Sequence, residues 1–197
     1  MKAPGSNDPW LLKQLGVESF QQRLPWIGGD LQTLRDTLRP VDLPIDQGEP
    51  VQIPVPALAS GAAEAGELLT YLDRPLGSGE ADSPPAPKAL VVVLHGLGGS
   101  SRREGLRRLT LSLQGAGFAV LRLNLRGADP GRHLAGGTYA AACNSDLLPV
   151  LQRARQMAAA LASEAGLPQP LPLLGAGISL GGTMLLTACL DQGGVLD

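Results

Sequence analysis

The chain has 197 residues, of which 44% are hydrophobic and 17% charged, and a formal net charge of −2. This length suffices for one domain with a buried core, and the 16 basic residues are offset by 18 acidic ones, which excludes a nucleic-acid partner held by phosphate neutralisation. Only two cysteines occur, so the sequence holds neither a disulfide framework nor a zinc-ligand cluster. We expect an α/β protein without a metal or another cofactor.

The first fifty residues are interrupted by prolines and contain two short predicted helices. The first helix is predicted over residues 9–15. The second is predicted over residues 30–38, because leucines recur at helical spacing, with Asp30 as its N-cap and Pro40 at its end. We interpret residues 1–50 as an N-terminal leader.

The predicted domain covers residues 51–197 and begins with two strands. Residues 51–55 alternate apolar and polar side chains but include a proline, a pattern typical of an edge strand. Residues 66–73 are predicted to pair with this strand. Residues 74–88 then form a loop or linker within the domain, rich in proline and glycine.

From residue 88 onward, apolar strands alternate with helices. The predicted strands are residues 89–94, 118–123 and 170–177, and the predicted helices are residues 102–114, 145–164 and 180–190. Continuous apolar runs are typical of strands buried on both faces of a parallel sheet. The order strand, helix, strand therefore predicts a mostly parallel sheet flanked by helices, with right-handed crossovers.

A G-x-S-x-G sequence over residues 177–181 follows the third of these strands and leads directly into a helix. In this setting the motif is typical of a nucleophile elbow, a sharp turn that exposes its serine at the end of the sheet. Gly177 and Gly181 would leave room for the turn. We predict Ser179 as a nucleophile, and the alternative is a serine that only caps the following helix.

A second glycine-rich loop, His-Gly-Leu-Gly-Gly, follows the first buried strand. An oxyanion needs a second N–H donor beside the one next to the serine. We predict that the backbone N–H groups of Leu97 and Leu180 supply the two donors, and that Gly96 and Gly98 let the loop come close enough. His95 is interpreted as a hydrogen-bonding residue that stabilises the loop rather than as the general base.

With these motifs, residues 88–191 resemble the α/β-hydrolase superfamily, and within it the YheT-like branch, also called AB hydrolase 4. The resemblance rests on four segments, residues 94–101 (LHGLGGSS), 123–127 (LNLRG), 145–147 (SDL) and 177–182 (GISLGG). The Asn-x-Arg-Gly sequence narrows the match to this branch. The resemblance implies hydrolysis of a small-molecule ester or lipid, a carboxylic ester or an acylglycerol, through an acyl-enzyme on Ser179.

The triad of this fold runs in the order serine, acid, histidine. Both histidines, His95 and His133, precede Ser179, and only Asp191 and Asp197 follow it as acids. The chain supplies the sheet through strand five and the nucleophile helix, so that strand would be an exposed apolar edge. We therefore expect an N-terminal fragment of a longer hydrolase, with little activity alone and the C-terminal half as a candidate separate chain. The alternative is a non-catalytic remnant or binding module of the same fold.

The remaining polar residues receive structural interpretations. Asp146 is expected to cap its helix, and His133 to lie at the surface. Cys143 and Cys189 are expected to be small, partly buried residues. Four arginines on one helix are interpreted as a solvated face, namely Arg102, Arg103, Arg107 and Arg108.

The sequence also predicts a location. Its longest aliphatic run, residues 89–94, is far shorter than the roughly 20 residues that a membrane-spanning helix needs. The first nine residues lack the apolar stretch of a secretory signal. We expect a cytoplasmic protein without a transmembrane segment.

Overall fold

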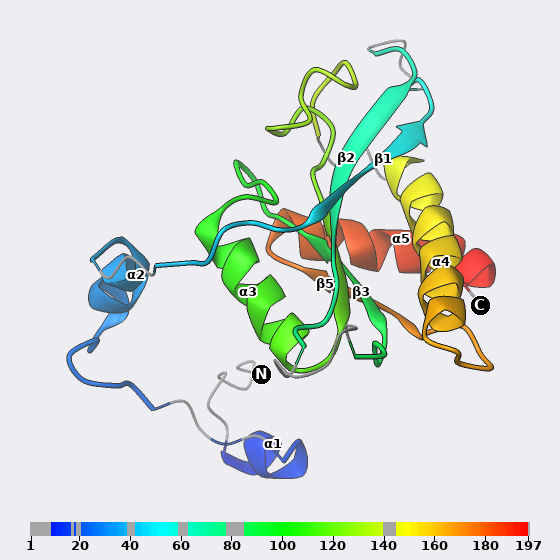
Figure 1. Ribbon diagram of the computed structural model, residues 1–197. Coiled ribbons are helices and arrows are strands. Elements are labelled where there is room, and N and C mark those ends of the chain that lie inside the picture. The colour runs from blue at the N-terminus through cyan, green and yellow to red at the C-terminus, as the bar shows by residue number, and fades with distance from the viewer. Residues whose placement is uncertain are drawn as a thin grey trace. The chain divides into compact units, whose positions relative to one another are not determined.

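The computed structural model (Figure 1) describes residues 9–16, 18, 21–38, 42–58, 63–77, 85–139 and 145–196. The chain divides into two compact units, residues 1–42 and residues 43–197. The first unit contains the helices α1 (Pro9–Gln14) and α2 (Gly29–Leu38). Both helices lie where the sequence predicts them.

One detail of α2 differs from the expectation. Because α2 begins at Gly29, Asp30 lies in the first turn and is not the N-cap. An acidic residue in the first turn is still favourable, since it offsets the partial positive charge of the helix N-terminus. Pro40 lies outside the described residues.

The second unit is built on one five-stranded sheet with the strand order β1-β2-β4-β3-β5. Its strands are β1 (Glu49–Val55), β2 (Gly66–Asp73), β3 (Leu90–Leu94), β4 (Ala119–Leu123) and β5 (Leu173–Gly177). β3 pairs in parallel with β4 and β5, whereas β2 is antiparallel to β1 and β4. β2 alone runs against the others, so the prediction of a mostly parallel sheet is confirmed.

β1 forms one edge of the sheet and pairs with β2, as predicted. Pro50 and Pro54 lie within this strand. A proline has no N–H to donate to a neighbouring strand, so an edge accommodates it best. The Thr70 hydroxyl adds a hydrogen bond to the Val51 carbonyl oxygen at 2.8 Å.

Helices cover both faces of the sheet (Figure 1). α3 (Glu104–Gly115) packs on one face, where Leu106 meets valines of β3 and β4. α4 (Leu147–Glu164) and α5 (Leu180–Leu196) contribute to the larger core on the other face. All residues of β3 and β4 are buried, which explains why β3 is a continuous apolar run in the sequence and why β4 is apolar except for Arg122.

Three helix boundaries differ from the predicted ones. α3 begins at Glu104 because Arg103 is extended, with φ −65° and ψ 142°. α4 begins at Leu147, after a short tight turn at residues 145–146. α5 continues to Leu196, since the glycines in its last turns lower helix propensity without ending the helix.

β5 forms the second edge of the sheet and is much more exposed than β3 and β4. Among the described strands it pairs with β3 alone, and none of its five residues is buried. Leu174 is 47% exposed on β5, and α5 exposes Leu186 and Leu190 by 68% and 86%. The expectation that the fifth strand is an exposed apolar edge is therefore confirmed for the described strands.

Candidate active site

Ser179 lies in the turn between β5 and α5. Its φ is +52°, and no other non-glycine residue of the described ranges has a positive φ. Such a conformation costs about 1–3 kcal/mol and persists only where the surroundings enforce it. Here Ile178 N–H donates to the Leu94 carbonyl oxygen, and Gly181 N–H donates to that of Ile178, both at 3.0 Å. The turn therefore holds Ser179 at the carboxyl ends of β5 and β3.

Two glycines allow this turn to pack closely. A Cβ atom on Gly177 would lie 2.3 Å from the Gly182 nitrogen and 2.4 Å from the Gly181 carbonyl carbon. A Cβ atom on Gly181 would lie 2.7 Å from the carbonyl oxygens of Leu94 and His95. Backbone atoms cannot move away as a flexible side chain can, so both positions require glycine.

The loop after β3 brings its main chain against the serine. A Cβ atom on Gly96 would lie 3.2 Å from Ser179 Cβ, and Gly98 has a φ of +67°. The main chain of Gly96 and the side chain of Ser179 are therefore in close contact. Within the described ranges, neither the Leu97 N–H nor the Leu180 N–H donates to a protein acceptor.

The topology places these two turns at a switch point of the sheet. β3 and β5 are neighbours, although β4 separates them in the chain, and the helices that follow them lie on opposite faces (Figure 1). Open α/β sheets bind ligands at such a switch point, outside the carboxyl ends of the strands. Ser179 and residues 96–99 lie at this point of the sheet.

His95 is buried and uses both ring nitrogens within the protein. Its Nδ1 lies 2.8 Å from the Gly96 carbonyl oxygen, so this nitrogen carries the proton. Its Nε2 accepts a hydrogen bond from Leu125 N–H at 3.1 Å. The interpretation of His95 as a loop-stabilising residue is confirmed, and no ring nitrogen remains to deprotonate Ser179.

The surface position expected for His133 is also confirmed.

Burial lowers the pKa of His95 below its ordinary value of 6.5, because the charged ring would lose its hydration, and the hydrogen bond to Gly96 opposes this only in part. The unfolded chain therefore takes up a proton near pH 6.5 that the folded chain binds only at lower pH. We expect the free energy of unfolding to fall as the pH drops below 6.5, by at most about 1.4 kcal/mol per pH unit. Urea unfolding from pH 7.5 to 5 measures this slope.

The matched control for this prediction is His95→Asn, which lacks the titrating ring but keeps an amide donor. The difference between the two proteins isolates the contribution of His95 from that of every other group. Equal slopes in the two proteins would contradict the prediction.

Tyr139 joins the loops after β3 and β4. Its hydroxyl accepts a hydrogen bond from Gly98 N–H at 2.6 Å, and its own N–H donates to the Arg126 carbonyl oxygen at 2.7 Å. Its ring also meets that of His95 edge-on, with centroids 5.4 Å apart. Sequence reasoning missed this residue because it lies in a loop without periodicity.

The Asn-x-Arg-Gly sequence has a structural role at the site. Asn124 Oδ1 accepts a hydrogen bond from Ser101 N–H at 2.9 Å, and Asn124 Nδ2 donates to the Leu69 carbonyl oxygen at 3.0 Å. The buried Arg126 guanidinium forms two hydrogen bonds to the Asp146 carboxylate, at 2.9 and 2.8 Å. These contacts fix the ends of the loops that follow β3 and β4.

The ion pair with Arg126 also corrects the expected role of Asp146. Its side chain makes no capping hydrogen bond to α4, because its oxygens bind the guanidinium instead. A short acidic side chain before a helix suits either role, and the position of Arg126 in space decides between them.

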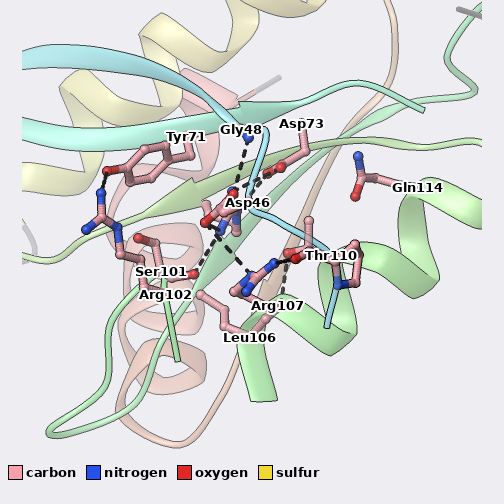
Figure 2. Close-up of polar contacts among 12 residues, drawn as sticks. Asp46, Gly48, Tyr71, Asp73, Ser101, Arg102, Leu106, Arg107, Thr110 and Gln114 are labelled. Atoms are coloured by element: carbon pink, nitrogen blue, oxygen red, sulfur yellow. Dashed lines mark hydrogen bonds and ion pairs between the residues drawn. The ribbon is translucent and has the colours of Figure 1, made fainter. Parts of the chain in front are cut away.

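On the α3 side of the sheet, the buried Arg122 is the centre of a second polar cluster. It bonds Asp73 at 2.7 Å, Asp46 at 2.6 Å and the Ser101 carbonyl oxygen at 3.0 Å. Figure 2 shows Asp46 and Asp73 with Arg107 nearby, whose guanidinium also bonds the Pro44 carbonyl oxygen. The hydrogen bond with Arg122 lowers the pKa of Asp46, whereas burial raises the pKa of Asp73 against the effect of the same arginine.

Two further expectations need correction. The four arginines do not share one helix, because α3 begins at Glu104 and Arg102 and Arg103 precede it as exposed residues. The other two are only partly solvated, since Arg107 packs toward Asp46 and Arg108 lies 3.7 Å from Glu104. Cys189 is exposed, because it lies on the open side of α5, and Cys143 lies outside the described residues.

Over the described ranges, no helix is long and apolar enough to cross a membrane, and no three acidic, histidine or cysteine side chains group as metal ligands.

The five-stranded sheet, its flanking helices and the serine turn together define an α/β-hydrolase fold. A lidless α/β serine hydrolase of Xanthomonas campestris is similar, with a TM-score of 0.50, 21% identity, and coverage of 77% of this chain and 60% of that one. An α/β serine hydrolase homologue of Coxiella burnetii gives a TM-score of 0.52 and 19% identity, covering 76% of this chain and 61% of that one. The chain therefore spans about 60% of the length of these structures. No family model and no curated protein matches the sequence.

Proposed function

We propose that this chain carries the nucleophile and the oxyanion hole of a serine hydrolase for carboxylic esters or acylglycerols. The observation that carries the proposal is the positive φ of Ser179, in a turn opposite the loop of residues 96–99. Strain of this kind concentrates at functional sites. A serine that only capped α5 would not need it, since N-cap residues are normally extended.

In the proposed reaction, Ser179 Oγ loses its proton to a base and attacks the carbonyl carbon of the ester. The carbonyl oxygen becomes an oxyanion that accepts hydrogen bonds from the N–H groups of Leu97 and Leu180. The C–O bond to the alcohol then breaks, the alcohol leaves with the proton, and an acyl group remains on Oγ. Attack by water releases the carboxylic acid and restores the serine hydroxyl.

The base for this reaction is proposed to lie on a further polypeptide segment, either of the same protein or of a separate chain. The ring nitrogens of His95 are occupied, and a serine hydroxyl without a base is a weak nucleophile. The unpaired edge of β5 and the exposed Leu186 and Leu190 support a segment that adds a strand there and covers α5. The histidine and the acid of the triad would come with it.

Ester hydrolysis by the purified chain tests the proposal that the base lies on a further segment. We expect turnover of p-nitrophenyl butyrate within a few-fold of that of the Ser179→Ala variant, because an oxyanion hole without the full triad keeps only residual catalysis. Ser163→Ala, an exposed serine on α4, is the control. Rapid turnover that Ser179→Ala abolishes would contradict the need for a further segment.

Two finer assignments belong to the same proposal. The YheT-like branch is supported by the Asn-x-Arg-Gly sequence, whose Asn124 and Arg126 side chains are both buried and hydrogen-bonded at the site. A cytoplasmic location is proposed from the sequence alone.

A further inference from the structure

A cavity of about 430 Å³ lies beside the loop that carries the proposed oxyanion hole. Its walls come from the loops after β3 and β4, at the carboxyl end of the sheet. Gly98 and Gly99 line the cavity, and Gly96 of the same loop packs against Ser179. A group bound in this cavity therefore contacts the loop that also faces the nucleophile.

The lining of the cavity has an excess of positive charge. Among the described residues that line it are Arg102, Arg103 and Arg132, against Asp129 as the single acid. Arg132 Nη2 lies 3.8 Å from Asp129, with the two side chains 69% and 74% exposed. A pair so exposed contributes little to stability, so Asp129 leaves most of the positive charge available to a ligand.

Two of the three arginines are each held in place by a hydrogen bond from one guanidinium nitrogen to another part of the protein. Arg102 Nη2 donates to the Tyr71 hydroxyl at 2.9 Å and lies over the Tyr71 ring (Figure 2). Arg132 Nε donates to the Gly127 carbonyl oxygen at 3.0 Å. The Arg103 side chain is exposed and makes no ion pair with any residue in the described part of the chain.

The walls that present these arginines are joined by hydrogen bonds and close backbone contacts. Tyr139 ties the two loops together through Gly98 and the Arg126 main chain. Gly127 has a φ of +77°, and a Cβ atom there would lie 2.7 Å from the Gly137 carbonyl oxygen. A site whose shape exists before binding loses less conformational entropy when the ligand arrives.

We propose that this cavity binds an anionic oxygen group, a carboxylate or a phosphate, on the ester that Ser179 attacks. This proposal rests on the proposed function and names its substrate class, an ester with an acidic end. Guanidinium groups recognise both anions through paired N–H donors. Arg103 and Arg132 are the specificity-determining residues, and an uncharged ester leaves their donors in water.

Binding to the intact chain, read by amide NMR shifts, tests this inference without requiring turnover. The probes are monomethyl succinate, methyl phosphate and the uncharged dimethyl succinate. We expect the charged probes to shift the signals of Gly98, Gly99 and Gly127, and Arg103→Gln to weaken their binding about fivefold to tenfold. Arg153→Gln, which removes the same charge from α4, is the control and should leave binding unchanged.

Equal binding of charged and uncharged probes, or equal losses in the two variants, would overturn the inference. The tighter of the two charged probes identifies the carboxylate or the phosphate as the group recognised. Binding that persists while Ser179 forms no fluorophosphonate adduct, even with free imidazole as the base, would reject the proposed function and retain the anion site. A reactive Ser179 without anion binding would reject the anion site alone.

Discussion

Replacing Arg126 by methionine is expected to lower the free energy of unfolding by about 3–5 kcal/mol. The substitution leaves the Asp146 carboxylate, which is 2% exposed, without its guanidinium partner. It also removes donors to the carbonyl oxygens of Pro56 and Gly136, at 2.9 and 3.1 Å. An uncompensated charge in the protein interior is costly because hydration is lost without replacement. Chemical denaturation followed by circular dichroism measures the loss.

Two further variants make the Arg126 prediction specific. Arg126→Lys keeps the charge but not the paired donors, so we expect an intermediate loss. Arg153→Met removes an exposed arginine from α4 and should change stability by less than about 0.5 kcal/mol. A loss for Arg126→Met no larger than that of Arg153→Met would show that the buried ion pair does not hold the loops.

Gly177→Ala is the second change with a large expected effect, a loss of about 3 kcal/mol in the free energy of unfolding. The new Cβ would lie 2.3–2.5 Å from backbone atoms of Gly181 and Gly182. The turn can relieve this overlap only by opening, which also moves Ser179 away from Gly96. Thermal and urea unfolding measure the loss.

Gly105→Ala is the matched control, because a Cβ atom at this position of α3 meets nothing within 4 Å. Alanine favours a helix over glycine, so this variant should be stabilised by up to about 1 kcal/mol. If Gly177→Ala were as stable as the wild-type chain, the close packing of the serine turn would be refuted.

The sequence predicts best those parts of the fold in which neighbouring residues share the same degree of burial. β3 is buried on both faces, so its apolar run has one good interpretation. β4 is equally buried and is apolar except for Arg122. The serine turn is also predictable, since the two glycines of a G-x-S-x-G sequence between a strand and a helix leave the room that a sharp turn needs. The position of Ser179 in the fold follows from that local pattern.

Contacts between distant segments were not predictable in the same way. Tyr139 meets Gly98 across 41 residues, and Arg126 meets Asp146 across 20. No periodicity links such positions, so the single sequence cannot distinguish a capping aspartate from an ion-paired one. The burial of Cys189 was also mispredicted. α5 is apolar on most sides, which favoured a partly buried cysteine, but Cys189 lies on a side of the helix that is open to solvent.

Fluorophosphonate labelling of the 197-residue chain, followed by intact-mass and peptide mass spectrometry, tests the central claim most directly. Free imidazole is added to stand in for the base that we propose on a further segment, since it can take the proton from a correctly placed serine. We predict a single adduct on Ser179, formed faster with imidazole than without it and absent from Ser179→Ala. No adduct on Ser179 in the presence of imidazole, or equal labelling of other serines, would contradict the assignment of Ser179 as the nucleophile.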